Sequence, residues 1–269
     1  MKVFLNSIPK SGTYLLASLA KKSGRLSPAQ GSINRKTALR FPASPGSEGA
    51  AVGIGDPGLA SLDTLADMLR AMPDKSYLTG HVPFSVTFAD LLDRHNCRHI
   101  LIVRDPRDVV LSLLRYVLAR PENFLHASIG RMQPETRVLD VASGLTDAEH
   151  GVRLLSIDDQ YRSIDGWIGR SDCCVVTFEE LIGERGGGSR EAQLAATRRI
   201  LHHIGIDSDD AVSRAADGAF DTSSPTFHSG RQNSWRHELP ADVADSLISK
   251  ARAALEIYER CTRTSLQPT

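Results

Sequence analysis

Short apolar runs alternate along the chain with stretches in which apolar residues recur every three or four positions. The apolar runs cover residues 2–7, 76–80, 98–103 and 173–178. Runs of this length are typical of strands that are buried on both faces of a parallel sheet. Helical spacing is found in residues 14–20, 59–72, 84–96, 109–116, 151–168, 189–204 and 240–262. This alternation predicts an α/β fold of three layers, in which helices flank a mostly parallel central sheet.

Two stretches show neither pattern clearly. Residues 25–58 are rich in Gly, Pro, Ser and Ala, and residues 120–149 have weak periodicity with several helix breakers. We interpret the first stretch as a long loop or a partly mobile segment. Both are expected to be variable loop regions within one domain that covers residues 1–269.

Charge balance, cysteine spacing and the lack of long apolar stretches bear on the partners and the location of the protein. The 32 basic residues balance 32 acidic ones, so nothing indicates binding to nucleic acid or to an anionic membrane surface. Four cysteines show neither disulfide nor metal-site spacing, which favours free thiols in a reducing compartment. The first predicted strand begins at Lys2, and no apolar stretch approaches the roughly 18 residues of a membrane span. We therefore expect a cytoplasmic protein without a membrane span.

The most informative segment is residues 8–13, Ile-Pro-Lys-Ser-Gly-Thr, between the first apolar run and the first helical stretch. A tight turn that leads from a strand into a helix directs backbone N–H groups and the positive end of the helix dipole at one point. Lys10 adds a cation, and Ser11 and Thr13 add hydroxyl donors. The segment differs from the nucleoside-triphosphate loop, whose lysine follows its second glycine. It predicts a phosphate or sulfate site, with an ordinary polar turn as the alternative.

A second anion site is predicted at Arg104, where the third apolar run ends. Asp105 suits a helix N-cap and Pro106 suits the first turn of a helix. Ser112 lies about two helical turns further along. An arginine at the carboxyl end of a strand, with a hydroxyl nearby, can hold a phosphate through a fork and one more donor. The alternative is a surface ion pair of Arg104 with Asp105 or Asp108.

Together the two segments resemble the sulfotransferases, here of the soluble, bacterial type, that use 3′-phosphoadenosine 5′-phosphosulfate (PAPS). Residues 9–13 are similar to the family's 5′-phosphosulfate loop, and Arg104 with Ser112 to its pair for the 3′-phosphate, with the same spacing of eight. The resemblance implies a P-loop-like nucleotide-binding fold and PAPS as co-substrate. It also implies adenosine 3′,5′-bisphosphate (PAP) as product, and no metal.

A third similarity is Gly80-His81-Val82-Pro83, which resembles the family's catalytic histidine segment. A histidine at a strand end suits a general base, since its unperturbed pKa is about 6.5. The resemblance makes His81 the base and Lys10 the group that stabilises the leaving phosphate, as the sulfo group moves to a hydroxyl or amine. The other histidines before the C-terminal loop, and His237 after it, are expected to be surface or structural residues.

The chain departs from the family pattern at several positions. Tyr14 stands where the family usually has a second threonine; its hydroxyl either substitutes in nucleotide binding or shapes the acceptor pocket. Thr79 stands where some cytosolic members carry a lysine that assists catalysis. Phe178 replaces a tyrosine that approaches the nucleotide, so the ring is kept and the hydroxyl is lost.

The C-terminal loop is similar to a family loop that closes over the 3′-phosphate. His228 and Ser229 stand at its basic positions, whereas Gly230 and Trp235 are retained. Arg231 is predicted to supply the missing charge, with a solvated loop arginine as the alternative. Trp235 is expected to pack and order the loop.

The acceptor is the least defined part of the prediction. Only 6% of residues are aromatic, which favours a polar acceptor, either a glycan or a hydroxylated small molecule, over a flat phenol or steroid. Residues 25–58 and 120–149 are expected either to form the acceptor pocket and its lid or to be disordered. A P-loop-like nucleotide kinase and a noncatalytic nucleotide-binding protein of the same fold remain alternative functions. A homodimer is an open alternative for the oligomeric state.

Overall fold

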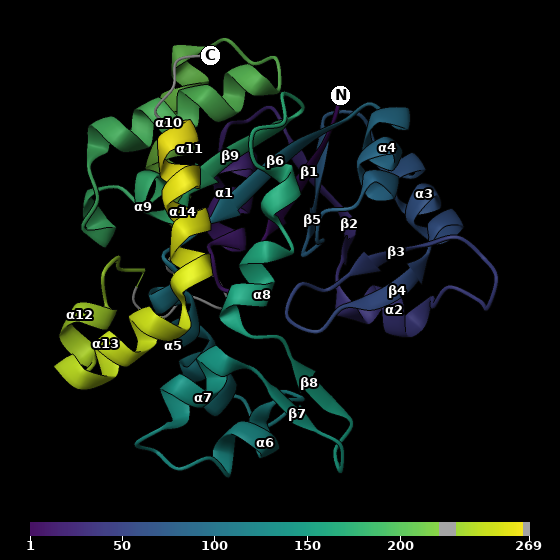
Figure 1. Cartoon of the computed structure of the whole chain (residues 1–269). Helices are drawn as coiled ribbons and strands as arrows, with labels where there is room; N and C mark the ends of the chain where they lie inside the picture. The colour runs from purple at the N-terminus through teal and green to yellow at the C-terminus, as the bar shows by residue number, and fades with distance from the viewer. Residues whose placement is uncertain (221–229, 266–269) are drawn as a thin grey trace.

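Five parallel strands form the centre of the molecule, which is a computed structural model that describes residues 1–220 and 230–265. The strand order is β2 (Ser27–Ile33), β5 (Ser76–Gly80), β1 (Lys2–Ser7), β6 (Cys97–Val103) and β9 (Cys173–Thr177) (Figure 1). All neighbouring pairs in this order are parallel. The four predicted strands are therefore confirmed, and β2 adds a fifth at one edge.

Both faces of the sheet are covered by helices. Along β1, Val3 and Leu5 face one apolar cluster whereas Phe4 faces the other, because successive side chains of a strand point to opposite faces. The first cluster includes α1 (Thr13–Lys22), α9 (Phe178–Leu181), α10 (Arg190–His203) and α11 (Asp209–Ala219). The second includes α3 (Leu62–Arg70), α4 (Val86–Arg94), α5 (Pro106–Leu118), α8 (Ile157–Arg162) and α14 (Arg252–Ser265). The predicted three-layer α/β fold is confirmed.

The interpretation of residues 25–58 as a long loop is wrong. The segment contains β2, α2 (Arg35–Arg40) and β3 (Gly49–Val52), and β3 pairs antiparallel with β4 (Gly58–Ser61). The sequence of β2, Ser-Pro-Ala-Gln-Gly-Ser-Ile, is mostly exposed. An edge strand needs only the backbone hydrogen bonds of one neighbour, so it carries no run of apolar residues that would identify it.

Several predicted helices are divided or shortened. Residues 151–168 do not form one helix: they hold β8 (Val152–Leu154), α8 and a 3₁₀ turn at Asp165–Trp167. Ser156 accounts for the break, because its side chain accepts the N–H of Asp159 and caps a new helix. Residues 240–262 likewise hold two helices, α13 (Ala241–Lys250) and α14. The remaining elements are α6 (His126–Gly130), α7 (Arg137–Ser143), β7 (Leu145–Asp147), a 3₁₀ turn at Glu184–Gly186 and α12 (Trp235–Glu238).

The carboxyl ends of the parallel strands all lie at the same edge of the sheet, where open α/β sheets bind their ligands. The loops that follow β1, β5, β6 and β9 therefore converge there. None of the helices in the described ranges has both the length and the apolar character needed to cross a bilayer.

Candidate active site

The turn after β1 depends on two residues with left-handed backbone conformations. Lys10 has φ 72° and Gly12 has φ 104°. A Cβ atom on Gly12 would lie 2.9 Å from Cδ2 of Phe178, so the turn requires glycine both for its conformation and for its close approach to that ring. Helix α1 begins at Thr13, and its first N–H groups have no intrahelical acceptor. The turn thus offers the donors of an anion site.

Lys10 lies over an aromatic ring inside this site. Its Nζ is 4.0 Å from the ring centroid of Tyr116. Burial, followed by the charges of Arg120 and Arg104, lowers the pKa of Lys10 to about 8. The ammonium form therefore predominates at neutral pH, in surroundings where a cation is poorly hydrated and an anion would bind it strongly.

The turn from β6 into α5 has the N-cap and the proline that the sequence predicted. Asp105 caps α5 by accepting the N–H of Arg107 at 2.9 Å, and Pro106 begins the helix. Arg104 is almost fully buried, with Nη2 3.5 Å from Asp108 Oδ2. Its guanidinium lies 4.2 Å from the ring centroid of Phe178. Arg104 therefore pairs with Asp108, but in a buried position and not on the surface, and Asp105 pairs with Arg107.

His81 follows β5, and the backbone of β1 fixes its tautomer. Its Nδ1 is 2.7 Å from the carbonyl oxygen of Ser7. A carbonyl can only accept, so Nδ1 carries the hydrogen and Nε2 keeps its lone pair. Asn6 holds the next residue through two bonds to Val82, with its Nδ2 2.8 Å from the carbonyl oxygen and its Oδ1 2.9 Å from the N–H.

The surroundings of His81 also favour its neutral form. Burial lowers the pKa of His81, the bond to Ser7 opposes this shift, and the charge of Lys10 lowers the pKa further. Ser7 links the turn after β1 to the segment after β5, because its Oγ is 2.6 Å from Oγ1 of Thr13 and 3.2 Å from Nδ1 of His81. The imidazole is therefore an uncharged proton acceptor at neutral pH.

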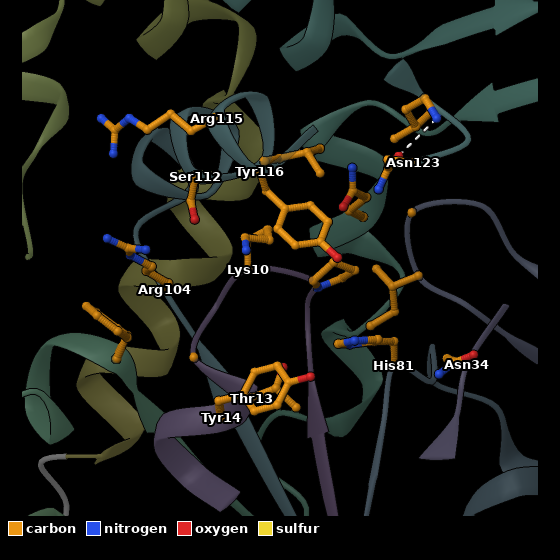
Figure 2. Close-up of a pocket in the computed structure, with 18 of the residues that line it drawn as sticks. Lys10, Thr13, Tyr14, Asn34, His81, Arg104, Ser112, Arg115, Tyr116 and Asn123 are labelled. Carbon is orange, nitrogen blue, oxygen red and sulfur yellow. Dashed lines mark hydrogen bonds between the residues drawn. The ribbon is translucent and has the colours of Figure 1, made fainter. Parts of the chain in front are cut away.

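A single cavity of about 470 Å³ brings these loops together (Figure 2). Its volume lies in the usual range of small-molecule sites. Most of the residues that the sequence predicted for the site line it: Lys10, Gly12, Thr13, Tyr14, His81, Arg104, Ser112, Phe178 and Gly230. In Figure 2, Lys10 lies between Arg104 on one side and His81 on the other.

Two predicted residues lie outside the cavity lining. Ser11 is fully buried beneath the turn, and its Oγ has no hydrogen-bond partner within the described part of the chain. The Arg231 side chain is exposed, and its carbonyl oxygen accepts a bond of 2.7 Å from Nη2 of Arg104. His228 and Ser229 lie outside the described residues. Trp235 is buried as expected, and its backbone N–H donates to Asp108 at 3.1 Å.

Sequence reasoning missed several residues of the cavity wall: Asn34, Arg35, Asp56, Tyr116, Arg120, Phe124 and Gln160. Tyr116 lies one helical turn after Ser112, so helical spacing could have indicated it. Arg35 and Phe124 come from the two stretches without clear periodicity. The Arg35 guanidinium lies 4.3 Å from the Phe124 ring centroid, so these stretches meet at the cavity.

Comparison with known proteins agrees with this geometry. Residues 1–123 match the family model described as "Sulfotransferase domain". The mouse sulfotransferase SULT7A1 complexed with PAP matches with a TM-score of 0.61 at 15% identity, covering 96% of this chain and 87% of that one. The family match covers residues 1–123, and the structural likeness over most of the chain shows that it has the sulfotransferase fold. The resemblance predicted from the two anion loops is thereby confirmed.

Two structures of retinol dehydratase are also similar to this chain. One is a complex with androsterone and the inactive cofactor PAP; its TM-score is 0.58 at 13% identity, covering 95% of this chain and 80% of that one. The other is a complex with retinol and PAP; its TM-score is 0.53 at 13% identity, covering 100% and 83%. No protein with a curated function matches the sequence significantly.

Proposed function

We propose that the protein is a sulfotransferase that moves a sulfo group from PAPS to a hydroxyl or amine of a small-molecule acceptor and releases PAP. The observation that carries this proposal is the single cavity lined by Lys10, Arg104, Ser112 and His81. The family match of residues 1–123 and the likeness to structures determined with PAP support it.

The two anion loops would bind opposite ends of the nucleotide. The turn around Lys10 suits the 5′-phosphosulfate, because N–H groups at the start of α1 and one ammonium converge there. Arg104 and Ser112 suit the 3′-phosphate. Arg104 donates a hydrogen bond to the backbone carbonyl of Arg231, so the C-terminal loop would lie beside the same phosphate. We propose the side chain of Arg231 as an additional ligand of that phosphate.

The proposed reaction is a displacement at sulfur, in which one bond to sulfur forms as another breaks. Nε2 of His81 accepts the proton of the acceptor hydroxyl while the acceptor oxygen bonds to sulfur. The bond between sulfur and the bridging phosphate oxygen breaks, and its electron pair remains on the leaving phosphate of PAP. Lys10 and the N–H groups of the turn stabilise the charge that develops on that oxygen.

A calorimetric titration separates this function from its rivals. PAP is expected to bind in the presence of a metal chelator, and Arg104→Ala is expected to weaken that binding. Magnesium-dependent binding of ATP, with no binding of PAP, would instead indicate a kinase. Binding of PAP without sulfation of any acceptor in a broad screen with radiolabelled PAPS would indicate a noncatalytic protein.

The cysteines support a proposed location in the cytoplasm. All four are free and buried, namely Cys97, Cys173, Cys174 and Cys261. Burial raises the pKa of the Cys97 thiol to about 12, so it stays a protonated, unreactive thiol. A fold whose cysteines remain free, buried thiols does not depend on disulfides, which suits a reducing compartment.

A further inference from the structure

We propose that the acceptor is a hydroxylated carboxylic acid whose acid group binds Arg35, at the end of the cavity remote from Arg104. This inference rests on the proposed sulfotransferase function and specifies its acceptor. In the view of Figure 2, Asn34, the residue before Arg35, lies beyond His81 from Arg104 and Lys10. His81 thus lies between the nucleotide loops and Asn34 in this view.

Backbone hydrogen bonds place Arg35 close to His81. The His81 N–H donates to the carbonyl of Ile33 at 2.9 Å, two residues before Arg35. The carbonyl of His81 accepts the N–H of Gly53 at 2.7 Å. Gly53 has φ 91°, and a Cβ atom there would lie 3.0 Å from Cα of Arg35. An acceptor whose hydroxyl reaches His81 is therefore within a short molecule's length of Arg35.

The Arg35 side chain is held in a fixed position. Its Nε forms an ion pair with Asp56, and its guanidinium lies over the ring of Phe124, 4.3 Å from the centroid. The side chain keeps 29% of its surface exposed, and both Arg35 and Asp56 line the cavity. A guanidinium that is immobilised in this way loses little entropy when it binds a carboxylate through its remaining N–H groups.

Cationic side chains outnumber acidic ones at this end of the cavity. Arg35 and Lys36 line it, and Asp56 is the only acidic residue among the described lining residues. Asp56 also pairs with a second arginine, because Nε of Arg153 lies 3.8 Å from its Oδ1. The positive charge left over favours an anionic group on the acceptor. A neutral glycan would leave that charge without a partner.

This end of the cavity also has apolar walls. Its lining includes Ile54, Phe124, Leu125 and Leu154. An acceptor that fits these surfaces has a hydroxyl at His81, a hydrocarbon body and an acid group at Arg35. A hydroxylated carboxylic acid has this order of groups.

The test compares acids with their uncharged primary amides. The probes are 4-hydroxyphenylacetate with 4-hydroxyphenylacetamide, and 12-hydroxydodecanoate with its amide. Their dissociation constants are measured by calorimetry on the protein saturated with PAP, so that no turnover is needed. At least one acid is expected to bind about 10-fold more tightly than its amide, because a charged hydrogen-bonded pair is worth about a factor of ten or more.

Matched variants assign the preference to Arg35. Arg35→Met is expected to abolish it, and Arg35→Lys, which keeps the charge and loses the fork, is expected to reduce it. Arg153→Met is the control, because Arg153 contacts the same Asp56 but does not line the cavity. It is expected to retain the preference. The PAP affinity of each variant reports whether it has folded.

The outcomes separate this inference from the function on which it rests. Absence of PAP binding in the unaltered protein would overturn both. Normal PAP binding with acids that bind no better than amides, or with an acid preference that survives in Arg35→Met, would overturn the acidic acceptor alone.

Discussion

His81 offers one basic atom to the cavity, because Nδ1 donates to the carbonyl of Ser7 and only Nε2 is left to accept a proton. His81→Asn is expected to lower kcat by roughly 10²–10⁴-fold, the usual contribution of a positioned base. The asparagine amide can still donate toward Ser7, so PAP affinity should change little. Single-turnover rates and calorimetric PAP titrations measure the two effects. Equal loss of rate and affinity would make His81 a structural residue.

Lys10 and His81 together predict a bell-shaped pH profile. The neutral imidazole is lost as pH falls through a pKa below the usual value of 6.5, and the ammonium is lost as pH rises through about 8. We expect kcat/KM for PAPS to fall on both sides of a maximum between these limits. Lys10→Arg, which stays charged, should remove the alkaline fall from whatever activity remains. An alkaline fall that persists in this variant would assign it to another group.

Gly12 is predicted to tolerate no side chain. Gly12→Ala would place a Cβ 2.9 Å from Phe178 at φ 104°, so PAP binding should be lost in addition to about 1–2 kcal/mol of stability. Gly24→Ala is the matched control: Gly24 has φ 72°, and its nearest neighbours would be 4.0 Å away. It should be destabilised while its PAP affinity is kept. Equal PAP affinity in the two variants would contradict the assignment of the turn. Denaturation and calorimetry supply the measurements.

The sequence could predict the positions of some site residues but not of others. Arg104 and His81 directly follow strands, and Lys10 lies in the turn just after β1, so their positions at the sheet edge could be predicted from local pattern and resemblance. Arg35 could not, because its place in the cavity depends on contacts with Asp56 and Phe124, which are distant in sequence. Arg231 shows the same limit, since pattern alone did not indicate that its backbone carbonyl would contact Arg104.

At the scale of elements, α9 connects β9 to the start of α5. Glu179 of α9 accepts the N–H of Asp105 at 3.1 Å, and Tyr161 of α8 donates to the carbonyl of Arg104. Tyr258 of α14 lies beside Glu179. The loop that carries Arg104 is therefore held by hydrogen bonds from α8 and α9 in addition to its own helix.

The buried Glu179 is expected to make the free energy of unfolding depend on pH. Burial raises its pKa to about 7, whereas an unfolded glutamate titrates near about 4.3. A carboxyl group with a raised folded pKa gives stability that is complete below the unfolded value and is lost as pH rises through the folded one. In Glu179→Gln, which stays neutral and can still accept from Asp105, the unfolding free energy should fall less between pH 5 and 7.5.

Urea titrations across this pH range provide the measurement. The exposed Glu184→Gln serves as the control, and its pH dependence should match that of the unaltered protein. A Glu179→Gln profile parallel to that of the unaltered protein would show that Glu179 is not the titrating group.

Elements with uniform apolar runs were predicted well, because β1, β5, β6 and β9 are buried on both faces. The edge strand β2 was missed, since backbone pairing with β5 holds it in place of apolar side chains. The break within residues 151–168 depends on one capping serine, which a periodicity count does not weigh.

For the whole molecule, the central claim is that one nucleotide spans two separate anion loops and directs its 5′ end toward His81. A crystal structure of the complex with PAP tests this claim most directly. We predict the 5′-phosphate at the turn of Lys10 and the 3′-phosphate at Arg104 and Ser112. PAP bound in the reverse direction, or outside this cavity, would contradict the claim.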